Sequence, residues 1–336
     1  MGKIYSHLTE SERVRIQAGL ESGLSLRGIA QQLGRPASAV SRELKRAGGA
    51  GAYHATRASD AAKQRRRRGP VKLKPGSALR ERVIEGLRQR WSPEQIAGRL
   101  RQMYPDNPDL HVCHETIYRA LYVMPRGELR KELIGLLRRA HKARLPRTQG
   151  RDRRGGLVDM VSIHQRPEEV LGRLIPGHWE GDLIKGAANR SAVGTLVERT
   201  SRFVLLAKMH DATADSALEA FTRRMRHLPA GLRKTLTYDQ GKEMAHHAEL
   251  ARRLKIQVYF ADPHSPWQRP SNENMNGLIR EYLPKGTDLS GFSQTYLNDI
   301  ARALNDRPRK CLGFKTPAEV FQQQINLLKN SVALQS

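Results

Sequence analysis

Apolar side chains recur at helical spacing along residues 1–62 and predict three short helices there. Thr9 and Glu12 have the spacing of a capping box, which would open the first helix. Ser25 can cap the second helix, and Gly34 can end it. The inner face of that second helix would carry Leu26, Ile29, Ala30 and Leu33.

The third helix of this segment would begin at Pro36 and turn Val40 and Leu44 inward. Its outward positions are small, polar or basic: Ser38, Ala39, Ser41, Arg42 and Lys45. A short helix, a glycine-containing turn and a helix with a polar-basic face are typical of a DNA-binding helix-turn-helix, and a plain helical bundle is the alternative. In a DNA reader, the two basic side chains would contact guanines or phosphates, and the two serines would contact either.

Residues 77–137 repeat this arrangement in a weaker form. Ser92 and Gln95 again form a capping-box pattern, with a proline at the first helical position. After a longer turn, a second helix would place Ile117 and Leu121 inward. The repeat predicts two tandem DNA readers, which would lengthen the DNA site.

Three residues of metal-binding type, His111, Cys113 and His114, lie just before this last helix. Nothing at zinc-finger spacing completes a site, so we interpret the segment as the start of a helix. The two cysteines, Cys113 and Cys311, are far apart in the sequence, which offers no disulfide framework and fits a reducing cytosol.

From residue 157 onward, short apolar and β-branched segments alternate with helical ones. The predicted elements are a strand at 178–186, a hairpin at 192–209, a helix at 214–228, a strand at 234–241, an intervening helix, a strand at 255–263 and a helix from about 272 to 282. This order, β-β-β-α-β-α-β-α, describes a mixed five-stranded sheet flanked by helices. It is also the order of the α/β ribonuclease H-like fold, so we expect a multidomain protein with all-α units in front of such a domain.

Two segments lack apolar periodicity and combine basic runs with Pro and Gly, so they are predicted linkers: 63–76 and 138–156. They separate three predicted domains. These are a helix-turn-helix domain at 1–62, a second helical domain at 77–137, and a ribonuclease H-like domain with C-terminal helices at 157–336.

The net charge of +26 is distributed unevenly, with +20 in residues 1–155 and +6 in residues 156–336. A front half this basic indicates a polyanionic partner, most simply double-stranded DNA. The basic run in the first linker adds four candidate DNA contacts, Arg65, Arg66, Arg67 and Arg68.

Three carboxylates of the last domain fall where the fold would bring them together. Asp182 lies in the first strand, Asp239 ends the neighbouring fourth strand, and Glu273 begins the helix after the fifth. Carboxylates this close would raise each other's pKa unless a cation gathers them, and oxygen ligands suit Mg²⁺ or Mn²⁺. Two such ions about 4 Å apart can activate an attacking oxygen and stabilise a leaving oxygen on phosphorus.

Three segments resemble bacterial insertion-sequence transposases of the IS-thirty family: GHWEGDLIKG, LTYDQGKEMAHH and FADPHSPWQRPSNENMNGLIREYLPKGTDLS. The tail LNDRPRKCLGFKTPAEVF and the N-terminal helix-turn-helix are similar too, so the resemblance covers nearly the whole chain. It implies a DDE transposase with an integrase-like catalytic core. It also carries the catalytic, metal-binding triad onto Asp182, Asp239 and Glu273.

One position departs from the pattern that the resemblance implies, since the family usually has Gly where this chain has Pro270. Proline suits a helix entrance, whereas a turn with positive φ at that position would displace Glu273.

Side chains near Glu273 are candidates for supporting roles. Asn276 and Arg280 follow at i+3 and i+7 on its helix face. Asn276 would bond a carboxylate or phosphate and Arg280 would pair with DNA, or both would merely pack the helix. His264 would orient water or DNA, or act as a structural turn residue. Glu180 would support the site or pair with an Arg or Lys.

The expected function is transposition of a mobile element. The helix-turn-helix units would bind the terminal inverted repeats, and the core would use two Mg²⁺ or Mn²⁺ ions. Water would cleave a DNA strand, and the freed 3′-OH would attack target DNA. Synapsis of two ends implies a homodimer or higher oligomer in action.

Two rivals remain open: a catalytically impaired, transposase-derived DNA-binding repressor, and a nuclease acting on RNA–DNA hybrids. No apolar run of transmembrane length is present, so the expected location is cytoplasmic, at the nucleoid, with no membrane partner.

Overall fold

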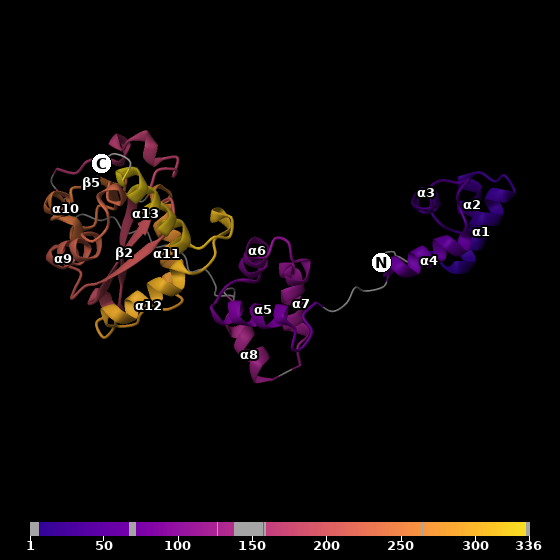
Figure 1. Cartoon of the computed structure of the whole chain (residues 1–336), viewed down its shortest axis with the longest axis horizontal. Helices are drawn as coiled ribbons and strands as arrows, with labels where there is room; N and C mark the ends of the chain where they lie inside the picture. The colour runs from indigo at the N-terminus through magenta and orange to yellow at the C-terminus, as the bar shows by residue number, and fades with distance from the viewer. Residues whose placement is uncertain are drawn as a thin grey trace. The chain divides into compact units, whose positions relative to one another are not determined.

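The computed structural model describes residues 7–66, 72–125, 127–137, 157, 159–263 and 265–333. The chain divides into two compact units, Met1–Val71 and Lys72–Ser336 (Figure 1). The predicted linker 138–156 lies outside the described residues. No helix in the described ranges is long and apolar enough to cross a membrane.

The described part of the first unit consists of α1 (Glu10–Glu21), α2 (Leu26–Gln32), α3 (Ala37–Arg46) and α4 (Ala55–Arg66). Helices α1 to α3 confirm the three predicted helices, and Ile16, Ile29 and Val40 form their shared core. The predicted capping box is present. The Glu12 N–H donates to Thr9 Oγ1 at 3.2 Å, and the Thr9 N–H donates to Glu12 Oε2 at 2.6 Å.

Helix α4 was not predicted, and it covers the first residues of the expected linker 63–76. It packs against α1, and its buried apolar side chains are Ala55, Ala58 and Ala62. Alanine is the best helix former but carries little apolar area, so a helix that buries alanines shows no hydrophobic stripe. Helical structure therefore continues past residue 62 to Arg66.

The second unit begins with a helical part: α5 (Ala78–Arg88), α6 (Pro93–Met103), α7 (His114–Val123) and α8 (Glu128–Gly135). The turn between α5 and α6 has the geometry of the turn between α1 and α2. The Leu24 N–H donates to the Gly19 carbonyl and the Trp91 N–H donates to the Gly86 carbonyl, both at 2.9 Å. The two units therefore share a turn geometry directly before the helices that the sequence repeat compares.

The rest of the second unit contains a five-stranded sheet: β1 (His178–Lys185), β2 (Ala192–Glu198), β3 (Val204–Lys208), β4 (Thr235–Tyr238) and β5 (Gln257–Phe260). The strand order is β3-β2-β1-β4-β5. Strand β2 is antiparallel to β1 and β3, whereas β4 is parallel to β1 and β5. This is the predicted mixed sheet, with the predicted contact between the first and fourth strands.

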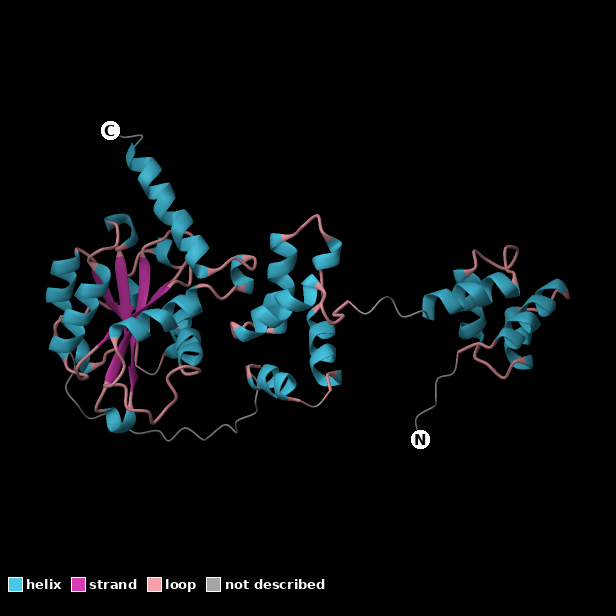
Figure 2. Ribbon diagram, turned by 60° about the horizontal axis from the view of Figure 1, so that its bottom comes forward, coloured by secondary structure: helices cyan, strands magenta, loops and turns pink. Residues whose placement is uncertain are grey.

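Helices cover both faces of this sheet: α9 (Ala214–Met225), α10 (His247–Leu254), α11 (Pro270–Ile279), α12 (Gln294–Asn305) and α13 (Pro317–Ala333) (Figure 2). On one face, Trp179 and Leu236 belong to a core with side chains of α9, α10 and α13. On the other face, Ile184 and Val193 belong to a core with side chains of α11 and α12. Because side chains alternate along a strand, Glu180 and Asp182 share the face of Ile184, toward α11.

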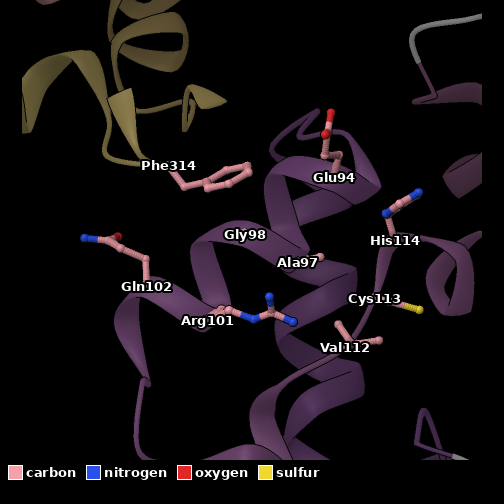
Figure 3. A pocket seen from close by; sticks show the side chains of 9 residues that line it. All are labelled: Glu94, Ala97, Gly98, Arg101, Gln102, Val112, Cys113, His114 and Phe314. Carbon is pink, nitrogen blue, oxygen red and sulfur yellow. The ribbon is translucent and has the colours of Figure 1, made fainter. Parts of the chain in front are cut away.

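Helix α6 docks on the segment between α12 and α13. The ring of Phe314 lies against Gly98 of α6, where an added Cβ would overlap the ring (Figure 3). Arg99 of α6 donates from Nη1 to Glu319 Oε2 at 2.9 Å, and a hollow of about 370 Å³ lies beside Phe314. The helical part and the sheet domain of this unit therefore share an interface.

A buried carboxylate ties α11 to the central strand. Glu180 on β1 has no solvent exposure. Its Oε1 accepts from Arg199 Nε at 3.0 Å, and its Oε2 accepts from the Asn272 N–H in the first turn of α11 at 2.9 Å. Of the two roles expected for Glu180, the pairing with an arginine is confirmed. The same carboxylate also positions the helix that carries Glu273.

Replacing Arg199 with Met should lower the free energy of unfolding by about 3–5 kcal/mol, because the Glu180 charge would stay buried without its partner. Urea unfolding followed by circular dichroism measures the change. The matched control is Arg302→Met, because Arg302 forms an exposed pair with Asp299 and should change stability by less than about 1 kcal/mol. Equal effects of the two substitutions would contradict the anchoring role of Glu180.

His178, at the start of β1, is buried, and its Nδ1 lies 2.9 Å from Thr235 Oγ1. Burial lowers the pKa of the imidazole from 6.5 to about 4. The unfolded chain therefore binds a proton more readily than the folded chain between these two values. His178 has the packing role that its position in an apolar strand indicates.

The free energy of unfolding should fall as pH drops from about 6.5 toward about 4, by up to about 1.4 kcal/mol per pH unit from this histidine. It should be independent of His178 above that window. His178→Gln should remove this component, so thermal unfolding of the two proteins at pH 7.5 and pH 5 should show a smaller pH effect in the variant. An identical pH dependence would mean that His178 accepts its proton while folded.

Candidate active site

Asp182 lies on β1 and Asp239 directly follows β4, the parallel neighbour of β1. The last register pair of these strands is Glu180 with Thr237, and each aspartate follows two residues later in its own chain. Asp239 comes directly after β4, at the carboxyl end of the strand. The predicted meeting of the two aspartates at one place on the sheet is therefore consistent with the register.

The environment of Asp182 holds its carboxylate in a defined orientation. Its Oδ1 accepts from the Leu183 N–H at 2.9 Å, and its Oδ2 accepts from Asn276 Nδ2 at 2.7 Å. Burial raises the pKa of Asp182, Arg269 opposes that rise, and the negative charge of Asp239 adds to it. The two aspartate carboxylates are therefore close enough to interact electrostatically.

Arg269 is the cation that sits against both aspartates. Its Nη2 lies 3.2 Å from Asp239 Oδ2, and its Nη1 lies 3.8 Å from Asp182 Oδ1. Nη1 also donates to the Gly181 carbonyl at 2.8 Å. The sequence alone indicates no role for Arg269, because the only recognisable feature beside it is Pro270, which restricts its backbone.

Glu273 lies in the first turn of α11 and its side chain is exposed. Across the described residues, no three His, Cys, Asp or Glu side chains are gathered closely enough to hold a metal ion. The structure therefore brings Asp182 and Asp239 around Arg269, and Glu273 stands outside that pair.

Pro270 is the first residue of α11, and neither it nor Arg269 has positive φ. A proline is well suited to this position because its fixed φ matches the helix and its missing N–H would be unpaired there anyway. Of the two possibilities raised by the sequence, the helix entrance is the one observed. The displacement of Glu273 by a positive-φ turn does not occur.

Two further candidates on α11 have defined partners. Asn276 donates to Asp182, as expected if it bonds a carboxylate. Arg280 donates from Nη2 to the Lys185 carbonyl at the end of β1, at 2.9 Å. His264 lies outside the described residues.

The candidate DNA contacts of the first unit lie on α3 and at the end of α4. The four candidates on α3, Ser38, Ser41, Arg42 and Lys45, are all exposed. Arg65 is exposed near the end of α4, and Arg66 is the last residue of that helix. The side chain of Arg66 and all of Arg67 and Arg68 lie outside the described residues. The outward face predicted for the third helix is therefore solvent-facing at these four positions, whereas Ala39 is half-buried.

Two domain models match the chain: a helix-turn-helix domain at residues 5–47 and an integrase core domain at residues 175–266. The second match spans β1 to β5 and both aspartates. Together, the two matches confirm the expected combination of an N-terminal helix-turn-helix with a ribonuclease H-like core.

Several full-length relatives also match. The transposase for insertion sequence element IS1086 of Cupriavidus metallidurans is 56% identical over 322 residues, covering 95% of each chain. Transposase InsI for insertion sequence element IS30A of Escherichia coli K12 is 42% identical over 326 residues, covering 96% of this chain and 85% of that one. The transposase for IS4351 of Bacteroides fragilis is 38% identical over 337 residues, covering 98% and 99%. These alignments show that the chain belongs to the family of bacterial insertion-sequence transposases.

Proposed function

We propose that the chain is a DDE transposase that cleaves DNA at the ends of its insertion sequence and joins the freed 3′ ends to target DNA. The observation that carries this proposal is the pair of aspartates on β1 and just after β4, beside the helix of Glu273, in a chain of this family. Water would attack phosphorus in the first step, and the freed 3′-OH would attack target DNA in the second.

The donor set at this position fits Mg²⁺ or Mn²⁺. Asp182 and Asp239 supply carboxylate oxygens, which hard divalent cations prefer, and the pair already attracts the cationic group of Arg269. Glu273 is exposed one turn into α11 and would complete the set through a change of rotamer. When bound, two ions would activate the attacking oxygen and stabilise the leaving oxygen on phosphorus.

The chain's own groups would orient these ligands. Asn276 fixes one oxygen of Asp182 by donating to it, which leaves the other oxygen directed by the backbone of Leu183. Glu180 fixes the start of α11 by accepting from the Asn272 N–H, and this sets the position of the Glu273 backbone. Such hydrogen-bonded partners would hold catalytic carboxylates within the narrow range of positions that phosphoryl transfer requires.

Terminal repeats would be bound by tandem helix-turn-helix units, the first reading DNA with α3 and the second with α7. The repeat in structure supports the second reader. Positive φ at Gly23 in one turn and at Arg90 in the other reverses the chain at equivalent points. Gly19 and Gly86 each allow an isoleucine of the next helix to approach closely. Synapsis of two element ends would require at least two copies of the chain.

The protein should cleave a duplex carrying the end of its own insertion sequence in the presence of Mg²⁺, and Asp239→Asn should reduce the rate at least about 1,000-fold because a metal ligand is removed. Gel analysis of end-labelled duplex measures cleavage. The control is Asp299→Asn on α12, which removes an exposed carboxylate away from the sheet and should cleave normally. If the wild-type protein binds the duplex tightly but never cuts it, the repressor function replaces this proposal. A preference for RNA–DNA hybrid would point to the nuclease.

Replacing Arg42 and Lys45 together with Ala should weaken binding to the element's end and reduce the slope of log K against log salt by about 2, because each side chain would neutralise one phosphate. Fluorescence anisotropy across a salt series measures both quantities. Arg15→Ala removes an exposed charge from α1 instead and should leave the slope nearly unchanged. If the double variant keeps the wild-type slope, α3 does not face the phosphates.

A further inference from the structure

The side chain of Arg269 lies between the two aspartate carboxylates and is largely buried. Only 14% of its side chain is exposed. Its two terminal nitrogens are divided between the carboxylates, Nη2 toward Asp239 and Nη1 toward Asp182. A planar guanidinium is suited to this because its donors point along fixed and separate directions. One positive group thus offsets the repulsion of two negative groups.

The guanidinium is not fully bonded in this position. Its Nε is buried without a hydrogen-bond partner, although Nη1 and Nη2 both have partners. The nearest aromatic face, that of Tyr238, lies 6.0 Å from the Arg269 Cζ, at the outer limit of a cation–π contact. A buried donor left unpaired costs free energy, so the contacts that hold the side chain are the two aspartates and the Gly181 carbonyl.

Arg269 is also joined to the helix of Glu273. It is the residue before Pro270, and its carbonyl accepts from the Glu273 N–H at 3.2 Å, which is the first bond of α11. Pro270, the next residue, has a fixed φ that restrains the backbone where α11 begins. The side chain of Arg269 can therefore leave the aspartates by rotation about its own bonds while α11 keeps its start.

We propose that Arg269 is the internal counter-ion of the aspartate pair, which a divalent cation displaces when it binds there. This inference rests on the proposed function, because it takes Asp182 and Asp239 as ligands of that cation. Arg269 is then a positioning residue. Without a metal ion it offsets the repulsion between the two carboxylates, and it lowers their affinity for the ion by competing with it.

The test is calorimetric titration of Mn²⁺ into the full chain without DNA. Arg269→Gln should bind Mn²⁺ about tenfold more tightly than the wild type, because one opposing charge near the ligands is removed. Arg302→Gln removes the same charge from an exposed position on α12 and should bind like the wild type. Arg269→Lys should lie between, since an ammonium has one charged atom and cannot face both aspartates at once.

The results separate the two proposals. If Arg269→Gln binds Mn²⁺ with unchanged or weaker affinity while the wild type binds it at Asp239, Arg269 serves only to build the site and the counter-ion role is wrong. If the wild type binds no Mn²⁺, or binds it equally well after Asp239→Asn, the metal site itself fails and both proposals are overturned.

Melting curves in EDTA give a second readout. Arg269→Gln should be less stable than the wild type, and Mn²⁺ should restore its stability by more than it raises that of the wild type. If Arg269→Gln does not fold, Arg269→Lys supplies the same comparison. Equal Mn²⁺ affinity in Arg269→Lys and the wild type would then count against displacement.

Discussion

The Glu180 carboxylate is the group on which the arrangement of the sheet domain depends. Removed from water, it must be paired, and it satisfies this requirement with Arg199 after β2 and with the backbone of Asn272 in α11. One side chain on the central strand thus fixes both a neighbouring strand end and the entrance of a helix. The positions of Asp182, Asn276 and Arg269 relative to one another follow from that helix entrance.

The chemistry of the site combines opposite demands on the same few groups. Three carboxylates suited to divalent cations are costly to hold close together, and the chain offsets this cost at Asp182 and Asp239 with Arg269. Glu273 remains in solvent, where its charge costs little.

Much of the fold could be predicted because it rests on local patterns. Short apolar and β-branched segments mark β1 to β5, and a strand that ends just before Asp239 places that aspartate beside β1. Helix α4 could not be predicted because its buried apolar side chains are all alanines. The role of Arg269 could not be predicted for a different reason: a long side chain can reach many places, and its destination depends on three-dimensional neighbours. The exposure of Glu273 is likewise a matter of rotamer, on which periodicity carries no information.

The packing of Phe314 on Gly98 has a consequence for how this protein can change during evolution. The helical part of the second unit accepts the aromatic ring only because α6 lacks a side chain at that point. Segments 72–137 and 308–319 are distant in the sequence but must be inherited as a matched pair. A recombinant that acquired this helical part from a relative would keep the interface only if its α6 also brought a glycine at the position of Gly98, so exchange of the helical part is constrained at a residue that makes room for an aromatic ring.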